Sequence, residues 1–251
     1  LPGIKVVLSI LFVLLFFPSI YSSYLDNTLI FLSPVDVITF DPGLTTDIYS
    51  SQIINNIFEG LTRYKSDKPD IEPCLAESWT MSNNGKRWVF RIRKGVKFHN
   101  GELLNASAVV KSFNTRLSDK MKYKEWNSFY NYLKKVKEID NYTVEFNLSE
   151  PFAPFLFQTA SAHSSIVAPS SYKGERFFPY GTGPFRFGSR KEGKFVKLIK
   201  NDSYWGKPAY LSSVIFKVVK DQKWRILQLR NGKADVSLLE STNNYSKVAN
   251  S

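Results

Sequence analysis

Apolar and polar side chains alternate along several short stretches of the chain, which is the pattern of strands with one buried face. The clearest case is residues 87–93, where Trp88, Phe90 and Ile92 alternate with three arginines. Three further apolar stretches predict strands, at 29–32, 142–148 and 214–219. The pattern therefore predicts a fold rich in short strands.

Two stretches carry apolar residues at helical spacing instead. Residues 53–58 predict a helix, and Gly60 is placed to end it in the left-handed conformation. Asn105 predicts the N-cap of a second helix, because its side chain can accept hydrogen bonds from the free amides of the first turn. Val109 and Phe113 would lie on the inner side of that helix.

Other signals mark shorter elements. Asp221 predicts the cap of a helix at 223–230, Glu150-Pro151-Phe152 predicts the start of a short helix, and residues 117–132 predict a loop or a broken helix. Two dipeptides that tolerate positive φ predict chain reversals, Asn84-Gly85 and Asn100-Gly101.

Composition favours a folded domain and leaves the partner open. The chain has 251 residues, of which 43% are apolar and 15% aromatic, enough to form a buried core. The formal net charge of +12 indicates attraction to acidic partners or simply a solvated basic surface. Cys74 is the only cysteine in the sequence, so we expect no internal disulfide and interpret it as a small apolar residue at a strand start.

The N-terminal residues predict export. Lys5 precedes an apolar run from Val6 to Phe17, interrupted only by Ser9, which is shorter than the roughly 20 residues of a membrane-spanning helix. We therefore expect residues 1–23 to be a signal peptide, with an uncleaved anchor as the alternative. No cysteine follows the run, so a lipid anchor is not expected and the predicted location is the periplasm. Export makes a nucleic-acid partner unexpected.

The candidate catalytic and metal-binding motifs are incomplete. Gly181-Thr182-Gly183 is followed by proline and an alternating strand pattern instead of a helix, which argues against a nucleotide site. His99 lies in the turn motif His99-Asn100-Gly101, and His163 lies far along the chain with no cysteine or carboxylate at metal-ligand spacing. Ser170 and Lys173 match a penicillin-binding motif, but its companion motifs are absent from the sequence.

A series of short motifs follows a distinctive order. From the N-terminus they are Asp41-Pro42, Glu59-Gly60-Leu61, Ala76-Glu77-Ser78-Trp79, Arg93 to Phe98, His99-Asn100-Gly101, Leu148 to Pro151, Gly181 to Phe185, Asn201 to Trp205 and Asn231 to Val236. This series resembles that of the extracytoplasmic solute-binding proteins of peptide and nickel ABC transporters, family 5. The chain departs from the family pattern at Leu103, where proline is usual, and at Ala108, where an acid is usual.

The resemblance implies an α/β fold of mixed α+β type. The expected architecture is a first lobe like that of type II periplasmic binding proteins, with an inserted accessory domain. Residues 24–57 and 182–251 would form the discontinuous, incomplete first lobe, and residues 58–181 the accessory domain. The second lobe of the family is expected to be missing from this chain.

The same resemblance implies function. The chain is expected to be the substrate-binding component of an ABC importer, which binds oligopeptides or dipeptides and delivers them to the permease. It is expected to be a monomer, not an enzyme, without cofactor or metal, with a peptide or other small solute and the permease membrane subunits as partners. With half of the clamp missing, residues 1–251 alone are expected to bind peptide weakly or not at all.

The resemblance leaves open which ligand the chain binds and which role it has. A nickel chelate, haem or sugar is an alternative ligand within the family, and a lone basic envelope lobe with an adhesive role is an alternative function.

The resemblance also suggests candidate ligand-binding residues. By alignment to the Asp41-Pro42 motif, the cleft edge would be formed by Thr46, Asp47, Ile48 and Tyr49. Trp126 would fall near an aromatic residue of the cleft. An ordinary loop role is the alternative for the first four residues, and core packing is the alternative for Trp126, because clustered aromatic residues most often lie in the core.

Overall fold

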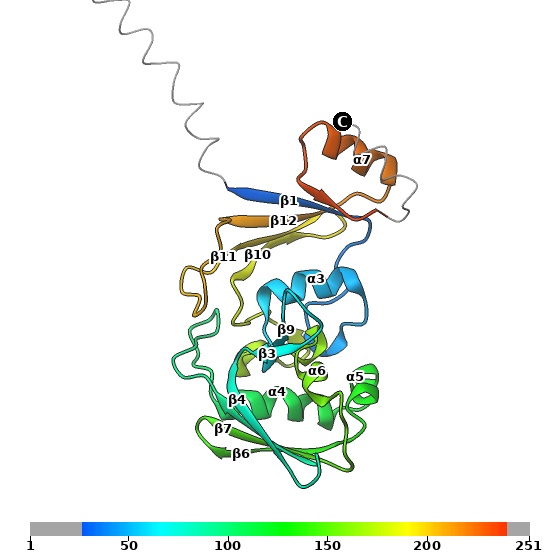
Figure 1. Ribbon diagram of the computed structural model, residues 1–251. Coiled ribbons are helices and arrows are strands. Elements are labelled where there is room, and N and C mark those ends of the chain that lie inside the picture. Colours follow the sequence, from blue (N-terminus) through cyan, green and yellow to red (C-terminus); the bar gives the residue numbers. More distant parts are fainter. Residues whose placement is uncertain (1–26, 240–251) are drawn as a thin grey trace, which may run out of the picture.

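The computed structural model describes residues 27–239 and has a mixed α/β fold with two main sheets (Figure 1). The first sheet has five strands in the order β10-β11-β12-β1-β13. They are β1 (Thr28–Ser33), β10 (Phe185–Lys191), β11 (Phe195–Lys200), β12 (Ser213–Val218) and β13 (Val236–Ser237). β1 runs parallel to its two neighbours, β12 and β13, whereas β11 is antiparallel to both β10 and β12. The sheet therefore joins segments from opposite ends of the described chain.

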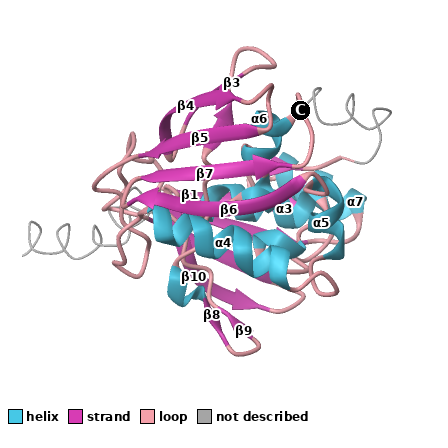
Figure 2. Ribbon diagram, turned by 90° about the horizontal axis from the view of Figure 1, so that it is seen from below, coloured by secondary structure: helices cyan, strands magenta, loops and turns pink. Residues whose placement is uncertain are grey.

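The second sheet has four antiparallel strands in the order β4-β5-β7-β6. They are β4 (Ala76–Ser82), β5 (Arg87–Ile92), β6 (Leu133–Asp140) and β7 (Thr143–Leu148). The helix α4 (Ala106–Ser118) packs along β6 and β7, as Figure 2 shows from below. Phe113 of α4 lies edge-on to Phe146 of β7, with ring centroids 4.9 Å apart.

Shorter elements surround the two sheets. The helices are α3 (Ile48–Ile57), α5 (Lys124–Phe129), α6 (Phe155–Thr159) and α7 (Gln222–Arg230). The 3-10 turns are η1 (Pro42–Leu44), η2 (Ala162–Ser164) and η3 (Pro169–Ser171). Two small hairpins complete the set, β2 (Thr62–Tyr64) with β3 (Ile71–Pro73) and β8 (Tyr172–Lys173) with β9 (Arg176–Phe177). Figure 1 shows α3 between the two sheets.

Each sheet has its own apolar core. One core packs Ile54 and Ile57 of α3 against Val196, Val214 and other residues of the first sheet. The other packs α4 and α5 against the second sheet and is dominated by aromatic rings. Burial of these apolar groups is the main stabilising contribution to such a fold.

Most of the predicted elements are confirmed. The predicted strands correspond to β1, β5, β7 and β12. Residues 117–132 form the predicted broken helix, because they contain the end of α4, a break, and the short helix α5. The side chain of Asn105 accepts from the amide of Ala108, and that of Asp221 accepts from the amide of Trp224. Positive φ angles of 53° at Asn84 and 88° at Gly101 mark the two predicted reversals.

The predicted left-handed cap at Gly60 is wrong. The helix α3 ends at Ile57, its C-cap is Phe58 in an extended conformation, and Gly60 is not among the described residues with positive φ. Glycine is needed at position 60 for a different reason. A Cβ atom there would lie 2.3 Å from the carbonyl oxygen of Thr159, so the position permits close approach of two backbone segments.

The helix predicted to begin at Glu150-Pro151-Phe152 begins later, at Phe155 with Pro154 as its N-cap. Proline suits the beginning of a helix, and the second proline of the stretch takes this place.

Within residues 27–239, every helix is too short or too polar to span a bilayer. The predicted signal peptide, residues 1–23, lies outside the described residues.

Candidate functional site

The candidate site follows the carboxyl end of β1. In sheets with parallel strands, ligands characteristically bind beyond the carboxyl ends of these strands. The parallel strands β1 and β12 end together at Ser33 and Val218, where the amide of Val219 donates to the carbonyl of Ser33 over 2.8 Å. The chain then runs through residues 34–49, which include four of the five predicted ligand-binding residues.

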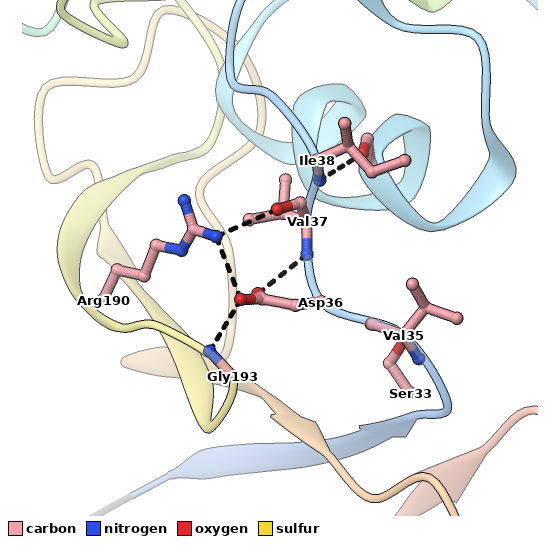
Figure 3. Close-up of polar contacts among 8 residues, drawn as sticks. Ser33, Val35, Asp36, Val37, Ile38, Arg190 and Gly193 are labelled. Atoms are coloured by element: carbon pink, nitrogen blue, oxygen red, sulfur yellow. Dashed lines mark hydrogen bonds and ion pairs between the residues drawn. The ribbon is translucent and has the colours of Figure 1, made fainter.

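Asp36 anchors this segment to the hairpin between β10 and β11. Figure 3 shows its carboxylate accepting hydrogen bonds from the Arg190 guanidinium at 2.9 Å and the amides of Gly193 and Val37 at 2.8 Å each. The same Arg190 nitrogen donates to the carbonyl of Val37 at 3.0 Å. Partial burial disfavours the charged carboxylate, but these hydrogen bonds outweigh it and lower the pKa of Asp36. An ionised, paired Asp36 therefore fixes the position of the segment.

A hollow of about 730 Å³ opens beside this network. Its walls combine residues 34–38 with the tip of the β10–β11 hairpin and the residues after β12. Val35 and Ile38 are 42% and 71% exposed. Asp36 and Arg190 neutralise each other, and the other charged residues of the lining, Glu192 and Lys220, carry one charge of each sign. The hollow therefore combines exposed apolar side chains with charges that balance. Such a site is suited to a ligand with apolar groups and no demand for one particular charge.

Asp41 organises the next part of the segment. Its buried carboxylate accepts from the amide of Gly43 at 2.9 Å, from the hydroxyl of Tyr123 at 2.8 Å and from the hydroxyl of Tyr172 at 3.2 Å. Burial raises the pKa of both tyrosine hydroxyls, that of Tyr172 to about 12, so both remain donors at neutral pH. The Asp41-Pro42 motif thus ties the start of η1 to α5 and β8.

Arg116 lies beside Gly43 and is fully buried. One of its terminal nitrogens donates to the carbonyl of Ser165 at 2.8 Å, while Nε and Nη1 have no hydrogen-bond partner among the described residues. Gly43 makes room for the guanidinium, because a Cβ atom there would lie 2.8 Å from Nε.

The predicted cleft-edge residues lie at the start of α3. Asp47 caps this helix by accepting from the amide of Ser50 at 2.8 Å, Thr46 and Ile48 are exposed, and Tyr49 is half-buried. The amide of Ile38 donates to the hydroxyl of Ser50 at 3.0 Å, so the start of α3 adjoins the hollow. Their role in ligand binding stays a prediction.

Trp126 lies apart from the other four residues, in the core of the second sheet. It is 1% exposed, stacks on Tyr130 with ring centroids 4.4 Å apart and meets the edge of Phe113. The packing interpretation is confirmed. A ligand-binding role for Trp126 stays a prediction; its ring lies 6.0 Å from the guanidinium of Arg116, next to the Asp41 cluster.

Sequence reasoning missed Asp36, Arg190 and Arg116. A charged residue three positions after the end of a strand was a usable signal for Asp36, whereas both arginines depend on contacts between distant parts of the chain. Within residues 27–239, no three His, Cys, Asp or Glu side chains are grouped so that they could hold a metal ion.

Comparisons with known proteins place these features in context. The sequence model for bacterial extracellular solute-binding proteins, family 5 Middle, matches residues 70–250. The nickel-binding periplasmic protein of Escherichia coli (strain K12) is 29% identical over 211 residues, 81% of this chain and 39% of that protein. The probable D,D-dipeptide-binding periplasmic protein DdpA of the same organism is 31% identical over 234 residues, 88% of this chain and 45% of that protein.

A solved structure has the same fold. It is the ABC transporter-associated periplasmic binding protein DppA from Helicobacter pylori in complex with the peptide STSA, with a TM-score of 0.83 and 31% identity. The match covers 89% of this chain and 49% of that chain. The chain therefore spans less than half the length of these relatives. All three are named as binding proteins, none as an enzyme.

Proposed function

Because the chain belongs to the bacterial extracellular solute-binding proteins of family 5, we propose that it acts in the periplasm as the substrate-binding component of an ABC importer. Its substrate in this proposal is an oligopeptide or dipeptide, which it delivers to the membrane subunits of the permease. The relatives named for a dipeptide and for a complex with a peptide support this substrate class.

One observation carries the choice of a peptide, the apolar hollow at the end of β1. Val35 and Ile38 present exposed apolar side chains there, and the charges of Asp36 and Arg190 are already paired. The two other charged residues of the lining, Glu192 and Lys220, have opposite signs. A site that accepts peptides of varied sequence needs contacts that do not select one charged side chain. Nickel chelates and haem, by contrast, call for charged groups or metal ligands at the site.

The proposal includes a division of the chain into lobes. Residues 24–57 and 182–251 would form part of the first lobe, and residues 58–181 an inserted accessory domain. The distribution of strands supports this division, since every strand of the first sheet falls in the first set and every strand of the second sheet in the other. The relatives extend well beyond the part matched here, which covers 39% of one and 49% of the other.

Peptide binding can be mapped on the chain by NMR. We would titrate ¹⁵N-labelled protein with a mixture of di-, tri- and tetrapeptides and, separately, with a nickel–histidine chelate and with haem. The expected result is weak binding that shifts the amide signals of residues 34–38 and 46–49. No shift at millimolar peptide, or shifts elsewhere, would contradict the proposed site. Shifts produced by the chelate or haem alone would identify another ligand class of the same family.

A second candidate function is adhesion to an acidic surface, which the outer face of the second sheet favours. Glu145 on this face pairs with Arg87 and Lys137, at 2.6 and 2.9 Å. By strand register the same face carries four cations, Arg87, Arg91, Lys135 and Lys137. The excess of positive charge would attract anionic head groups. Co-sedimentation with phosphatidylglycerol vesicles tests this candidate: binding should weaken with salt and be absent with phosphatidylcholine.

A further inference from the structure

A second hollow, separate from the one beside Asp36, lies at the edge strand β10. Its volume is about 320 Å³, and its lining residues have none in common with the first hollow. Most of the lining is aromatic and comes from three parts of the chain: Phe40 before η1, Phe177 to Tyr180 after β9, and Phe187 in β10. Pockets of this size lined mainly by apolar and aromatic groups are typical of small-ligand sites.

The aromatic walls are well defined. Phe40 and Phe187 form an edge-to-face pair with ring centroids 5.2 Å apart. Phe178 and Tyr180 are stacked, with centroids 5.9 Å apart and planes 11° apart. The four rings remain partly exposed, and three of them, Phe40, Tyr180 and Phe187, pack against a buried core. Between these pairs, a further ring would find faces and edges that suit aromatic packing.

The polar groups of this hollow are Arg186 and His99. The imidazole of His99 accepts from the amide of Gly181 at 3.3 Å and donates to the carbonyl of Gly183 at 3.0 Å, so both nitrogens are occupied. Burial lowers the pKa of His99, which keeps it neutral at pH 7. The wall beneath the rings is therefore fixed and uncharged.

Arg186 supplies the charge. Its side chain is exposed and, within residues 27–239, makes no hydrogen bond or ion pair with another side chain. It also borders an adjacent polar hollow, where two further charged residues of opposite sign, Lys97 and Asp202, lie. A guanidinium is pre-organised to bind a carboxylate through two parallel hydrogen bonds. An anionic group held by Arg186 would extend from the aromatic hollow towards this polar one.

From this arrangement we propose that the hollow at β10 is a second binding site, which takes a small aromatic carboxylate with its ring between Phe187 and Phe178 and its carboxylate on Arg186. The argument rests on charge complementarity and on the aromatic lining, and it is independent of peptide binding at the first hollow. The ligand class follows from the sign of the charge: an aromatic amine of the same size would meet an unpaired cation.

Calorimetry on the 251-residue chain tests the proposal with three matched probes. These are 3-phenylpropanoate, its neutral amide 3-phenylpropanamide and the cation 2-phenylethylamine. The propanoate should bind, and the amine should bind at least tenfold more weakly. Absence of propanoate binding at about 10 mM, where even a weak small ligand is detected, would overturn the proposal. So would equal binding of the amine.

Variants locate the site. Arg186→Gln should weaken the binding of the propanoate about tenfold, because a charged bidentate contact is lost, and should leave the affinity for the amide unchanged. Arg91→Gln, with the same charge change on the second sheet, should leave both affinities as in the wild type. Phe187→Leu should weaken the binding of both the propanoate and the amide. If Arg186→Gln and Arg91→Gln change the affinity for the propanoate equally, the carboxylate does not bind Arg186 and the proposal fails. Saturating peptide should not displace the propanoate, which separates this test from the proposed function.

Discussion

Glu59 accepts a hydrogen bond of 2.7 Å from the hydroxyl of Tyr204, across 145 positions of the chain. The same carboxylate accepts from the indole of Trp205 and the hydroxyl of Thr182, both at 2.8 Å, and from the thiol of Cys74 at 3.7 Å. Burial raises the pKa of Glu59, and no cation is among its partners in the described part of the chain. Glu59 thus joins the end of α3 to segments beside both sheets.

Glu59→Gln should destabilise the protein. The amide group places an N–H donor where two donors already point, so at least one buried group loses its partner. We expect a loss of about 1–3 kcal/mol in the free energy of unfolding, the usual cost of an unsatisfied buried polar group. Urea unfolding measures it, with the exposed Glu138→Gln as the control, which should change stability by less than about 0.5 kcal/mol. Equal effects of the two substitutions would show that the carboxylate of Glu59 has no special role.

The sequence predicts local features well because their causes are local. Asn105 caps α4 through an amide only three positions away, and this geometry can be read from spacing. Tyr204, a partner of Glu59, and Arg190, a partner of Asp36, lie more than a hundred positions away in the sequence, and their contacts depend on how the sheets assemble. Gly60 illustrates the difference: glycine near a helix end predicts a cap, whereas the real constraint is the distant carbonyl of Thr159.

Gly60→Ala should therefore lower the free energy of unfolding more than the same substitution at an exposed glycine with positive φ. The new methyl group would clash with the backbone of Thr159, and such overpacking typically costs about 1–3 kcal/mol. Gly101→Ala is the comparison, since φ is 88° there but a Cβ atom at this position would have no neighbouring atom within 4 Å. Gly101→Ala should lower the free energy of unfolding only by the cost of holding alanine in a left-handed backbone conformation, about 1–2 kcal/mol. A smaller effect at Gly60 than at Gly101 in urea unfolding would contradict the close-approach argument.

Glu145 should make stability fall in acid. Burial alone would raise its pKa, but hydrogen bonds from Lys137, Asn147 and Arg87 outweigh burial and lower the pKa to about 2. A carboxyl group whose pKa is lower in the folded state stabilises it above the unfolded value of 4.5, and this contribution is lost as the pH falls towards 2. Glu145→Gln should thus destabilise by about 1–3 kcal/mol at pH 7 and much less near pH 2. A difference that stays constant between these pH values would refute the linkage.

Asp36 and Arg190 should be energetically coupled. A double-mutant cycle with Asp36→Asn and Arg190→Gln isolates their interaction, which we expect to be about 0.5–1 kcal/mol because both side chains are partly exposed. Arg190→Lys keeps the charge but loses the planar group that reaches both Asp36 and the carbonyl of Val37, so it should recover only part of the stability. Additive effects of the two single substitutions would show that the pair contributes nothing.

Ile38 provides the sharpest test of the hollow as a peptide site. Its side chain is 71% exposed, so Ile38→Asp should leave the free energy of unfolding within about 0.5 kcal/mol of the wild type. The new carboxylate would need to lose its hydration when a peptide covers it, so peptide-induced NMR shifts at residues 34–38 should disappear. Ile139, which is 49% exposed on β6, offers the matched control. Ile139→Asp should preserve these shifts; if both substitutions preserve them, peptides do not bind at this hollow.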